Sequence, residues 1–255
     1  MKDEQSKNRP DLVRRALSLS ALGVMGVGTL ALAGCGGSDD EDTAQLRFAN
    51  ATPDRLTFRY NGQRATDVDG YGGVSNFGEI DTGGTNVAIR TLNGSADLAS
   101  SSVNAAKDSF LSALAYGTLA SPRVRFFEEN SSQPGSGDTR IRFFHANSTN
   151  APLNVYLTSL SGPLNTPTFQ LAGYEALSDF ATISGGNSNV YRIRITPQDS
   201  TTTVLFDSGA SSPGVTFSGR SVITLVVAPS NSGSFLNLMV LPEQAGGGRI
   251  DNVLF

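Results

Sequence analysis

The sequence reads GYGGVSNFGEI over residues 70–80 and GYEALSDFATI over residues 173–183. Gly, Tyr, Ser, Phe and Ile hold the same places in both stretches. A glycine follows three residues after the isoleucine in each, at Gly83 and Gly186. Recurrence of one pattern at this length indicates an internal repeat. The part of the chain after residue 44 is therefore predicted to hold two copies of one domain.

The repeated stretch does not alternate like one regular strand. Successive side chains of a strand point to opposite faces, so Phe77 and Ile80 cannot lie on the same face. Either a bulge or bend near Gly78 changes the alternation, or both faces of the sheet are covered. The small residues at the matching positions, Gly78 and Ala181, favour the bend.

Short alternating segments surround the repeated stretch. Leu46 and Phe48 flank a polar residue, and residues 56–60 alternate again before the hairpin signal Asn61-Gly62. The same order returns over residues 141–157. Each copy offers about seven short strands, which is typical of a sandwich. The predicted fold is all-β, with two tandem immunoglobulin-like antiparallel β-sandwich domains after a lipoprotein signal peptide.

Composition shifts set the predicted domain boundaries, notably the Gly/Ser-rich segment after residue 130. The predicted segments are a lipoprotein signal peptide (1–34), a lipidated Cys35 with a flexible tether (35–44), a first β-sandwich repeat (45–130), a linker (131–138), a second β-sandwich repeat (139–244) and a C-terminal tail (245–255).

Composition and charge exclude several classes of protein. Apolar residues make up 38% of the 255 residues and charged residues 16%, which is too hydrophobic for a disordered chain. Removing the five basic and three acidic residues of 1–34 from the totals of 19 and 23 leaves 14 and 20, a net charge of −6. This balance argues against nucleic-acid binding. With Cys35 the one cysteine and His145 the one histidine, no disulfide, metal site or cofactor is expected.

The amino end has the form of a secretory signal. Five basic residues precede an uncharged run over residues 16–34. The run ends in Leu32-Ala33-Gly34-Cys35, which resembles the bacterial lipobox. That resemblance implies cleavage before Cys35 and acylation of its thiol. Two or three acyl chains, at roughly 0.8 kcal/mol per buried methylene, hold a protein firmly on a bilayer.

Alternatives for this segment are an ordinary signal or a membrane-spanning helix. Gly, Ser and Thr dilute the apolar run, which disfavours a spanning helix. Gly36 stands where an Asp would resemble an inner-membrane retention signal, so the outer membrane is predicted. Arg14-Arg15 leaves export by the general secretory route or by the twin-arginine route open.

Several short matches carry a resemblance to a known family. His145-Ala146, Ala151-Pro152 and Val155-Tyr156 match its turn and following strand in the second copy, and residues 50–54 match them in the first. Over most of residues 44–243 the chain resembles the domain of unknown function 4397 family of secreted and lipid-anchored bacterial proteins. Departures are Asn50 in place of the family's His and residues 147–150 in place of Ser-Pro-Asp. The resemblance implies a β-sandwich in the cell envelope and transfers no catalytic residues.

His145 is the first candidate for chemistry. It falls at the inward-facing end of a strand, where the first copy has Asn50, and both side chains can bond the backbone of the following turn. A catalytic triad would need a base oriented by an acid and a nucleophile, and no nucleophile-elbow pattern is present. The structural role is predicted.

Two other features allow a functional and a structural interpretation. Asp67 and Asp69 could bind calcium, but the further ligands of a calcium loop are absent, so a solvated turn is predicted. Tyr71 and Tyr174 could form an aromatic ligand platform, and a place in the core with the hydroxyl near the surface is favoured.

These observations predict a non-enzymatic, lipid-anchored cell-envelope protein. Its expected role is as a binding or scaffolding module at the outer membrane or cell surface, with an envelope protein or a glycan as partner. The alternative is an assembly or accessory factor for other envelope components. A hydrolase is disfavoured because no catalytic set is visible. The ligand, the face of the membrane and the oligomeric state stay open.

Overall fold

The computed structural model describes residues 42–254 except 130–131, 149–150, 187, 211–213 and 231–234. All regular structure in that part of the chain is β-strand, so the all-β prediction is confirmed. No helix among the described residues is long and apolar enough to cross a membrane. The predicted signal peptide, the lipobox residues Leu32, Ala33 and Gly34, and Cys35 lie outside the described residues.

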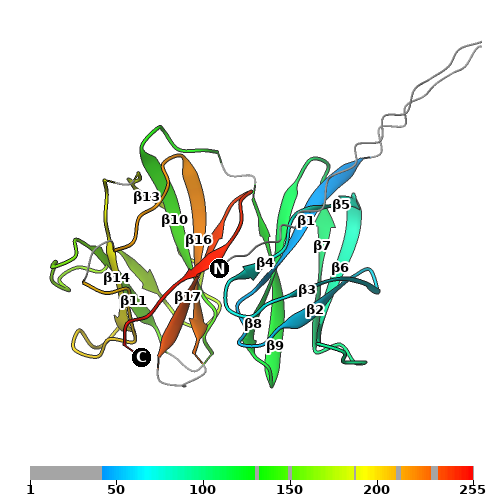
Figure 1. The fold of residues 1–255 in the computed structure, drawn as a ribbon, viewed down its shortest axis with the longest axis horizontal. Coiled ribbons are helices and arrows are strands. Elements are labelled where there is room, and N and C mark those ends of the chain that lie inside the picture. Colours follow the sequence, from blue (N-terminus) through cyan, green and yellow to red (C-terminus); the bar gives the residue numbers. More distant parts are fainter. Residues whose placement is uncertain are drawn as a thin grey trace, which may run out of the picture. The chain divides into compact units, whose positions relative to one another are not determined.

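The first half of the described chain is a two-sheet sandwich (Figure 1). One sheet has the order β4-β1-β8-β9, with β5 also paired to β1, and the other has the order β3-β2-β6-β7. Leu46, Phe48, Phe58 and Ile89 belong to the core between them. The strands are β1 (Thr43–Asn50), β2 (Leu56–Tyr60), β3 (Gln63–Val68), β4 (Gly73–Val74), β5 (Gly78–Asp81), β6 (Gly83–Thr91), β7 (Ala99–Ala105), β8 (Phe110–Thr118) and β9 (Ser121–Glu128).

The second half is also a two-sheet sandwich, with the orders β13-β10-β16-β17-β18 and β12-β11-β14-β15. Ile141, Phe143, Phe169 and Leu225 belong to its core. The segment assigned to the C-terminal tail contributes β18 to the larger sheet. The strands are β10 (Asp138–His145), β11 (Leu153–Thr158), β12 (Phe169–Leu171), β13 (Ala181–Ser184), β14 (Arg192–Pro197), β15 (Phe206–Asp207), β16 (Ser221–Pro229), β17 (Leu236–Pro242) and β18 (Gly248–Ile250).

One pairing in each half is parallel. β1 runs parallel to β8, and β10 runs parallel to β16, while the other described strand pairs are antiparallel. Parallel neighbours need a long crossover connection. In each half the chain visits the opposite sheet between the two strands, which supplies that crossover. The antiparallel prediction therefore holds for every described pair except these two.

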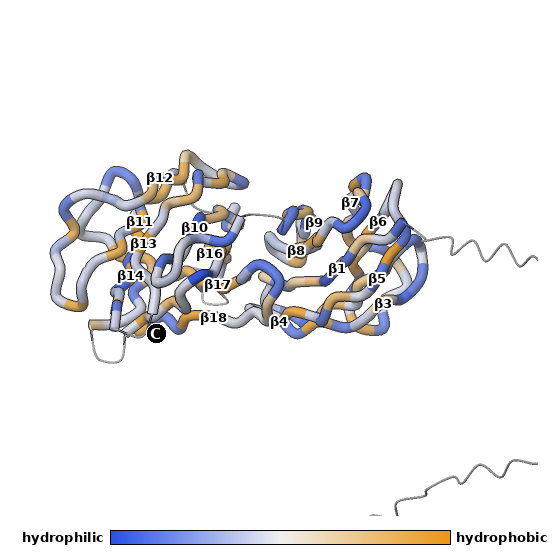
Figure 2. The backbone as a smooth tube through the Cα atoms, turned by 90° about the horizontal axis from the view of Figure 1, so that it is seen from above, coloured by the Kyte–Doolittle hydropathy of each residue, from blue (hydrophilic) through white to orange (hydrophobic). Residues whose placement is uncertain are grey.

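The outer faces of the two larger sheets pack against each other. A third apolar core joins them and includes Leu114, Tyr116 and Phe127 from the first half and Phe144 and Val226 from the second. Figure 2 shows β8 and β9 on one side of this junction and β10 and β16 on the other. The result is four sheet layers in one compact unit that runs from Asp40 to Phe255. β8 and β16 are consequently buried on both faces.

The repeated stretch forms a bulge in each half. Between the pairs Ala49–Val74 and Leu46–Gly78, three residues of the stretch face two of β1. The second half repeats this spacing between Phe144–Leu177 and Ile141–Ala181. A bulge with one extra residue changes the alternation, so the predicted bend is confirmed.

The shared serine of the repeated stretch supports each bulge. The backbone N–H of Phe48 donates to Ser75 Oγ at 2.9 Å, and that of Phe143 donates to Ser178 Oγ at 2.9 Å. In each case a side-chain oxygen accepts a bond that a regular ladder would supply from the backbone.

Ser178→Ala should lower the free energy of unfolding by about 1–2 kcal/mol, because the buried N–H of Phe143 loses its acceptor. Urea denaturation followed by circular dichroism measures the change. Ser100→Ala, at an exposed position of β7, is the control and should change stability by less than about 0.5 kcal/mol. Equal effects of the two substitutions would contradict the role assigned to Ser178.

Candidate functional site

The two halves meet through surfaces that correspond to each other. Tyr71 of the first half packs on the shared core and bonds the side chain of Asn237, and burial raises its pKa to about 12. Tyr174 of the second half packs on the same core, with the Arg123 guanidinium 5.6 Å from its ring centre. Arg123 and Asn237 hold equivalent positions in β9 and β17. In the first half Asn50 pairs with Ala115, which pairs with Val124. In the second half His145, the counterpart of Asn50, pairs with Val227, which pairs with Leu238. The residues that precede Val124 and Leu238 are therefore equivalent.

This correspondence fails at one cluster of polar side chains. On one side of the junction Glu175 lies among three residues of the first half, Tyr116, Arg123 and Arg125. The equivalent positions on the other side hold no charge, namely Gly72, Ala228, Asn237 and Met239. The halves also pack against each other at the equivalent uncharged positions. A charged cluster is therefore not needed for this packing.

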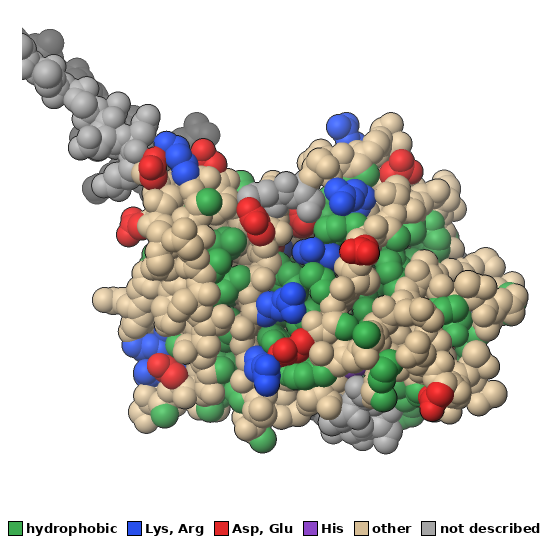
Figure 3. All heavy atoms as spheres, turned by 180° about the vertical axis from the view of Figure 1, so that it is seen from behind, with side chains coloured by type: hydrophobic (Ala, Val, Ile, Leu, Met, Phe, Trp, Pro, Cys, Tyr) green, Lys and Arg blue, Asp and Glu red, His purple; other side chains and the backbone are tan. Residues whose placement is uncertain are grey.

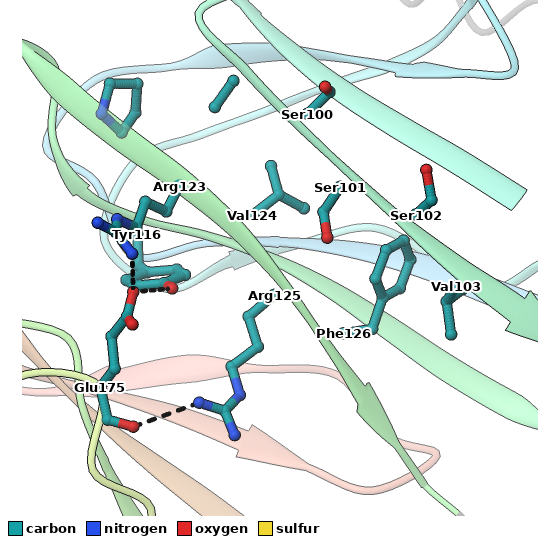
Figure 4. Close-up of a pocket in the computed structure, with 12 residues that line it drawn as sticks. Ser100, Ser101, Ser102, Val103, Tyr116, Arg123, Val124, Arg125, Phe126 and Glu175 are labelled. Atoms are coloured by element: carbon teal, nitrogen blue, oxygen red, sulfur yellow. Dashed lines mark hydrogen bonds and ion pairs between the residues drawn. The ribbon is translucent and has the colours of Figure 1, made fainter.

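Glu175 is the centre of the cluster (Figure 4). The Tyr116 hydroxyl donates to Glu175 Oε1 at 2.6 Å, and Arg123 Nη1 donates to the same oxygen at 2.8 Å. Arg125 Nη1 donates to the backbone oxygen of Glu175 at 3.3 Å. The Arg125 guanidinium also lies 4.9 Å from the ring centre of Phe144. The two guanidinium groups are therefore held in place by the second half.

Burial and charge keep Tyr116 protonated and Arg123 charged. Burial, together with the hydrogen bond to Glu175, raises the pKa of the Tyr116 hydroxyl well above its ordinary value of 10.0. The Glu175 carboxylate raises the pKa of Arg123. At neutral pH Tyr116 is thus a neutral donor and Arg123 a permanent cation.

The backbone at Glu175 is in the left-handed region. Its φ is +67°, and the equivalent Gly72 has a φ of +104°. A residue with a side chain costs roughly 1 kcal/mol or more in this conformation, which glycine adopts freely. Strain of this kind occurs often at functional sites. Glu175 therefore lies at a position where the fold alone would favour glycine.

A groove of about 620 Å³ extends from this cluster. Its walls are residues 99–103 of β7 and residues 122–126 of β9, with Tyr116 and Glu175 also lining it. Figure 4 shows the hydroxyls of Ser100, Ser101 and Ser102 on the β7 side and the two arginines on the β9 side. The face in Figure 3 shows basic and acidic side chains next to one another and no broad patch of one sign.

His145 has the structural role predicted for it. Its ring is fully buried, its Nε2 lies 3.3 Å from the backbone oxygen of Ala151, and the Asn147 N–H donates to its Nδ1 at 3.3 Å. Asn50 bonds its own turn in the same way, with Nδ2 donating to the oxygen of Asp54 at 2.8 Å. Both ring nitrogens of His145 are engaged by the following turn, and the side chain lies outside the groove.

Stability should fall as the pH is lowered through the titration of His145. Burial lowers its pKa below the ordinary 6.5, so between the folded and unfolded pKa values the unfolded chain binds more protons. The stabilisation is therefore present above about pH 6.5 and is lost below it. Thermal unfolding of the chain and of His145→Asn between pH 5 and pH 8 measures this. Asn is the residue of the first half, and its variant should show the flatter profile; parallel profiles would contradict the assignment.

The aspartates considered for calcium face arginines. Asp67 accepts from Thr57 Oγ1 at 2.8 Å, which lowers its pKa, and from Arg64 Nη2 at 2.7 Å. Asp69 lies 3.4 Å from Arg55 Nε and is exposed. Over the described ranges, no group of three or more His, Cys, Asp and Glu side chains suits a metal ion. The solvated-turn prediction therefore agrees with Asp69, which is exposed after β3, and is wrong for Asp67, which lies within β3 with its side chain only 15% exposed.

Tyr71 and Tyr174 lie against the core between the halves rather than inside either sandwich. The sequence did not predict this junction or the groove. A usable signal was the unbroken apolar run at residues 113–116 of β8, since a strand buried on both faces does not alternate. A second signal was the replacement of Gly72 by Glu175 in the repeat.

Comparison with known proteins gives one family. Residues 44–156 match the model of the family described as Domain of unknown function (DUF4397), which confirms the resemblance for the first half and the start of the second. The match covers less than half of the chain. No curated protein matches the sequence.

Proposed function

We propose that this chain is a non-enzymatic, lipid-anchored protein of the cell envelope that binds a partner in the groove beside Glu175. One observation carries the proposal. Glu175 occupies a strained position with two arginines and a tyrosine around it, whereas the equivalent position across the junction is an unstrained glycine with uncharged neighbours. A side chain kept at a cost in conformational energy supports a role in binding.

The non-enzymatic part of the proposal draws on His145. General-base catalysis needs a side chain that can reach the substrate. The ring of His145 is fully buried, and both of its nitrogens are engaged by backbone groups. This supports a binding role over hydrolysis.

The second half is proposed to be a further copy of the domain that matches in the first. The matching sheet orders, the two parallel pairs and the two serine-supported bulges favour this assignment. The tandem arrangement completes the polar cluster at the groove, because Glu175 comes from the second copy and the arginines from the first.

The lipid anchor is tested by Cys35→Ala. Acyl chains on this cysteine would hold the protein on the membrane, so the variant should move to the soluble fraction of lysed cells. Retention of the variant in the membrane fraction would overturn the anchor and with it the predicted place at the outer membrane.

The binding role is tested by photo-cross-linking in intact cells. A photoreactive amino acid at Ser102, on the β7 wall of the groove, should capture a partner from the cell envelope. Glu175→Gly should abolish capture while the protein stays folded, because relief of the strained backbone offsets part of the loss of the bonds to Tyr116 and Arg123. Arg64, exposed on β3, provides a matched control position, and no shared product is expected there. Capture that is unchanged by Glu175→Gly would overturn the assignment of the groove.

A further inference from the structure

β7 differs from the other edge strands of the described sheets. It pairs with β6 along its whole length, Ala99–Ala105 against Gly83–Ile89, without a break in register. Its other edge pairs with no described strand. The strand carries no charge, no proline and no bulge. An exposed, regular and uncharged edge is a template for pairing with another strand.

The remaining edges carry the features that normally prevent such pairing. β3 has a bulge opposite Phe58 and Arg59 and carries a charged Arg64. β9 contains Pro122 and two arginines, and the edge strands β4 and β5 have only 2 and 4 residues. In the second half the edge strands β12, β13, β15 and β18 have only 3, 4, 2 and 3 residues. β7, with seven residues, is the long unprotected edge of the described part.

The charge of the groove selects the kind of strand that could be added. Residues 99–103 of β7 form one wall, and Arg123 and Arg125 lie on the other. Arg123 pairs with the carboxylate of Glu175, whereas Arg125 donates to the backbone oxygen of Glu175, so these two guanidinium groups share one carboxylate. The Arg123 side chain is 54% exposed, so it can contact a bound molecule. An acidic ligand complements this arrangement.

We propose that β7 accepts an extended acidic segment of a partner protein as an additional strand, with its carboxylates directed toward Arg123 and Arg125. The inference rests on the proposed binding role of the groove and names its ligand. Backbone hydrogen bonds to β7 supply affinity for an extended chain, and the arginines select for acidic side chains. A seven-residue edge offers about 23 Å for pairing.

Three labelled octapeptides test the proposal by fluorescence anisotropy with the chain from residue 36, which contains the whole compact unit. The first alternates Glu with Val, the second alternates Lys with Val, and the third keeps the glutamates but has proline in place of valine. The first should bind at least about tenfold more tightly than the second, which has the wrong charge. The affinity of the first peptide should exceed that of the third by a similar factor, because proline lacks the N–H needed for strand pairing.

Substitutions locate the binding. Arg123→Glu should weaken binding of the acidic peptide about tenfold and improve that of the basic peptide. Arg64→Glu, a charge reversal at a similarly exposed position on β3, is the matched control and should leave both affinities unchanged. Equal binding of all three peptides, or equal effects of the two substitutions, would overturn the proposal.

Other outcomes separate this inference from the proposed function. If Ser102 captures a partner in cells but the acidic peptide does not bind, the acidic-strand inference is wrong and the binding role stands. Tighter binding of an acidic oligosaccharide, tested with oligogalacturonate, would point to a glycan and would also overturn the inference. If neither capture nor peptide binding occurs, both proposals fail.

Discussion

Replacing Arg47 with alanine should lower the free energy of unfolding by about 3–5 kcal/mol, the loss expected when one member of a buried ion pair is removed. The Arg47 side chain is 1% exposed, and its Nη2 lies 2.7 Å from Glu129 Oε1. Its Nε donates to Ser112 Oγ at 2.7 Å, which joins β1 to β8. The substitution leaves the Glu129 carboxylate buried without its cation.

Arg47 also joins the two halves of the chain. Its Nη2 donates to the backbone oxygen of Pro242 at 2.5 Å, and its Nη1 donates to that of Ala245. Glu129 completes the contact by accepting from the backbone N–H of Gln244 at 2.7 Å. Loss of Arg47 should therefore loosen the turn between β17 and β18 as well as the first sandwich. Chemical denaturation measures the total loss, and hydrogen exchange at Gln244 measures the local one.

The second half supplies a matched control for this prediction. Arg142 occupies the equivalent position in β10, and its Nε donates to Thr224 Oγ1 at 2.9 Å. It is only partly buried, and it stacks on Phe180 at 4.4 Å. Arg142→Ala should therefore cost about 2 kcal/mol, the loss expected for one hydrogen bond and the two cation–π contacts with Phe180 and Phe127. Similar losses for both substitutions would show that burial of the Arg47 ion pair is unimportant.

The double variant Arg47→Met with Glu129→Leu separates the ion pair from the packing. Replacing both partners by apolar residues removes the unpaired buried charge, and such replacements are often neutral or stabilising. The double variant should regain most of the stability lost by Arg47→Ala. A double variant as unstable as the single one would place the stabilisation in the bonds to Pro242 and Ala245 instead.

The alternation of residues 46–48 predicts the strand correctly but not the surroundings of Arg47. Leu46 and Phe48 do face the sandwich core, as the pattern indicates. The same pattern places Arg47 on the solvent side, whereas the second half covers that face. Alternation reports which side chains share a face, and it carries no information on what covers the other face. The bulge, by contrast, could be predicted, because it changes the alternation of side chains in the sequence itself.

The polar groove could not be predicted because its parts are far apart in the sequence. Tyr116 and Arg123 come from adjacent strands of the first half, and Glu175 comes from the repeated stretch of the second. Only the packing of the two larger sheets brings them together. The unprotected edge of β7 could not be predicted either. Its Ser-rich sequence resembles a loop, and only its pairing with β6 identifies it as a strand.

Phe144→Ala should have an effect as large as that of Arg47→Ala, a loss of about 3–5 kcal/mol, because it creates a cavity between the halves. Phe144 is fully buried, and its ring lies edge-on at 5.2 Å from Tyr116 and 5.4 Å from Phe127. Ala49 holds the equivalent position in the first half and belongs to the same core. One half thus contributes a large side chain to the junction and the other a small one. The small Ala49 cannot fill the cavity that Phe144→Ala leaves.

Phe180→Ala in the same half is the control for Phe144→Ala. Phe180 is partly buried on the outer surface of the sheet, where Arg140 and Arg142 stack on it at 4.6 and 4.4 Å. Its removal opens no closed cavity and should cost less than about 2 kcal/mol. Scanning calorimetry should show one cooperative transition for the parent chain and for Phe180→Ala. For Phe144→Ala we expect two, since the halves lose the packing that couples them. A single transition with little loss would mean that the Arg47 cluster alone joins the halves, and that the apolar junction contributes little to their coupling.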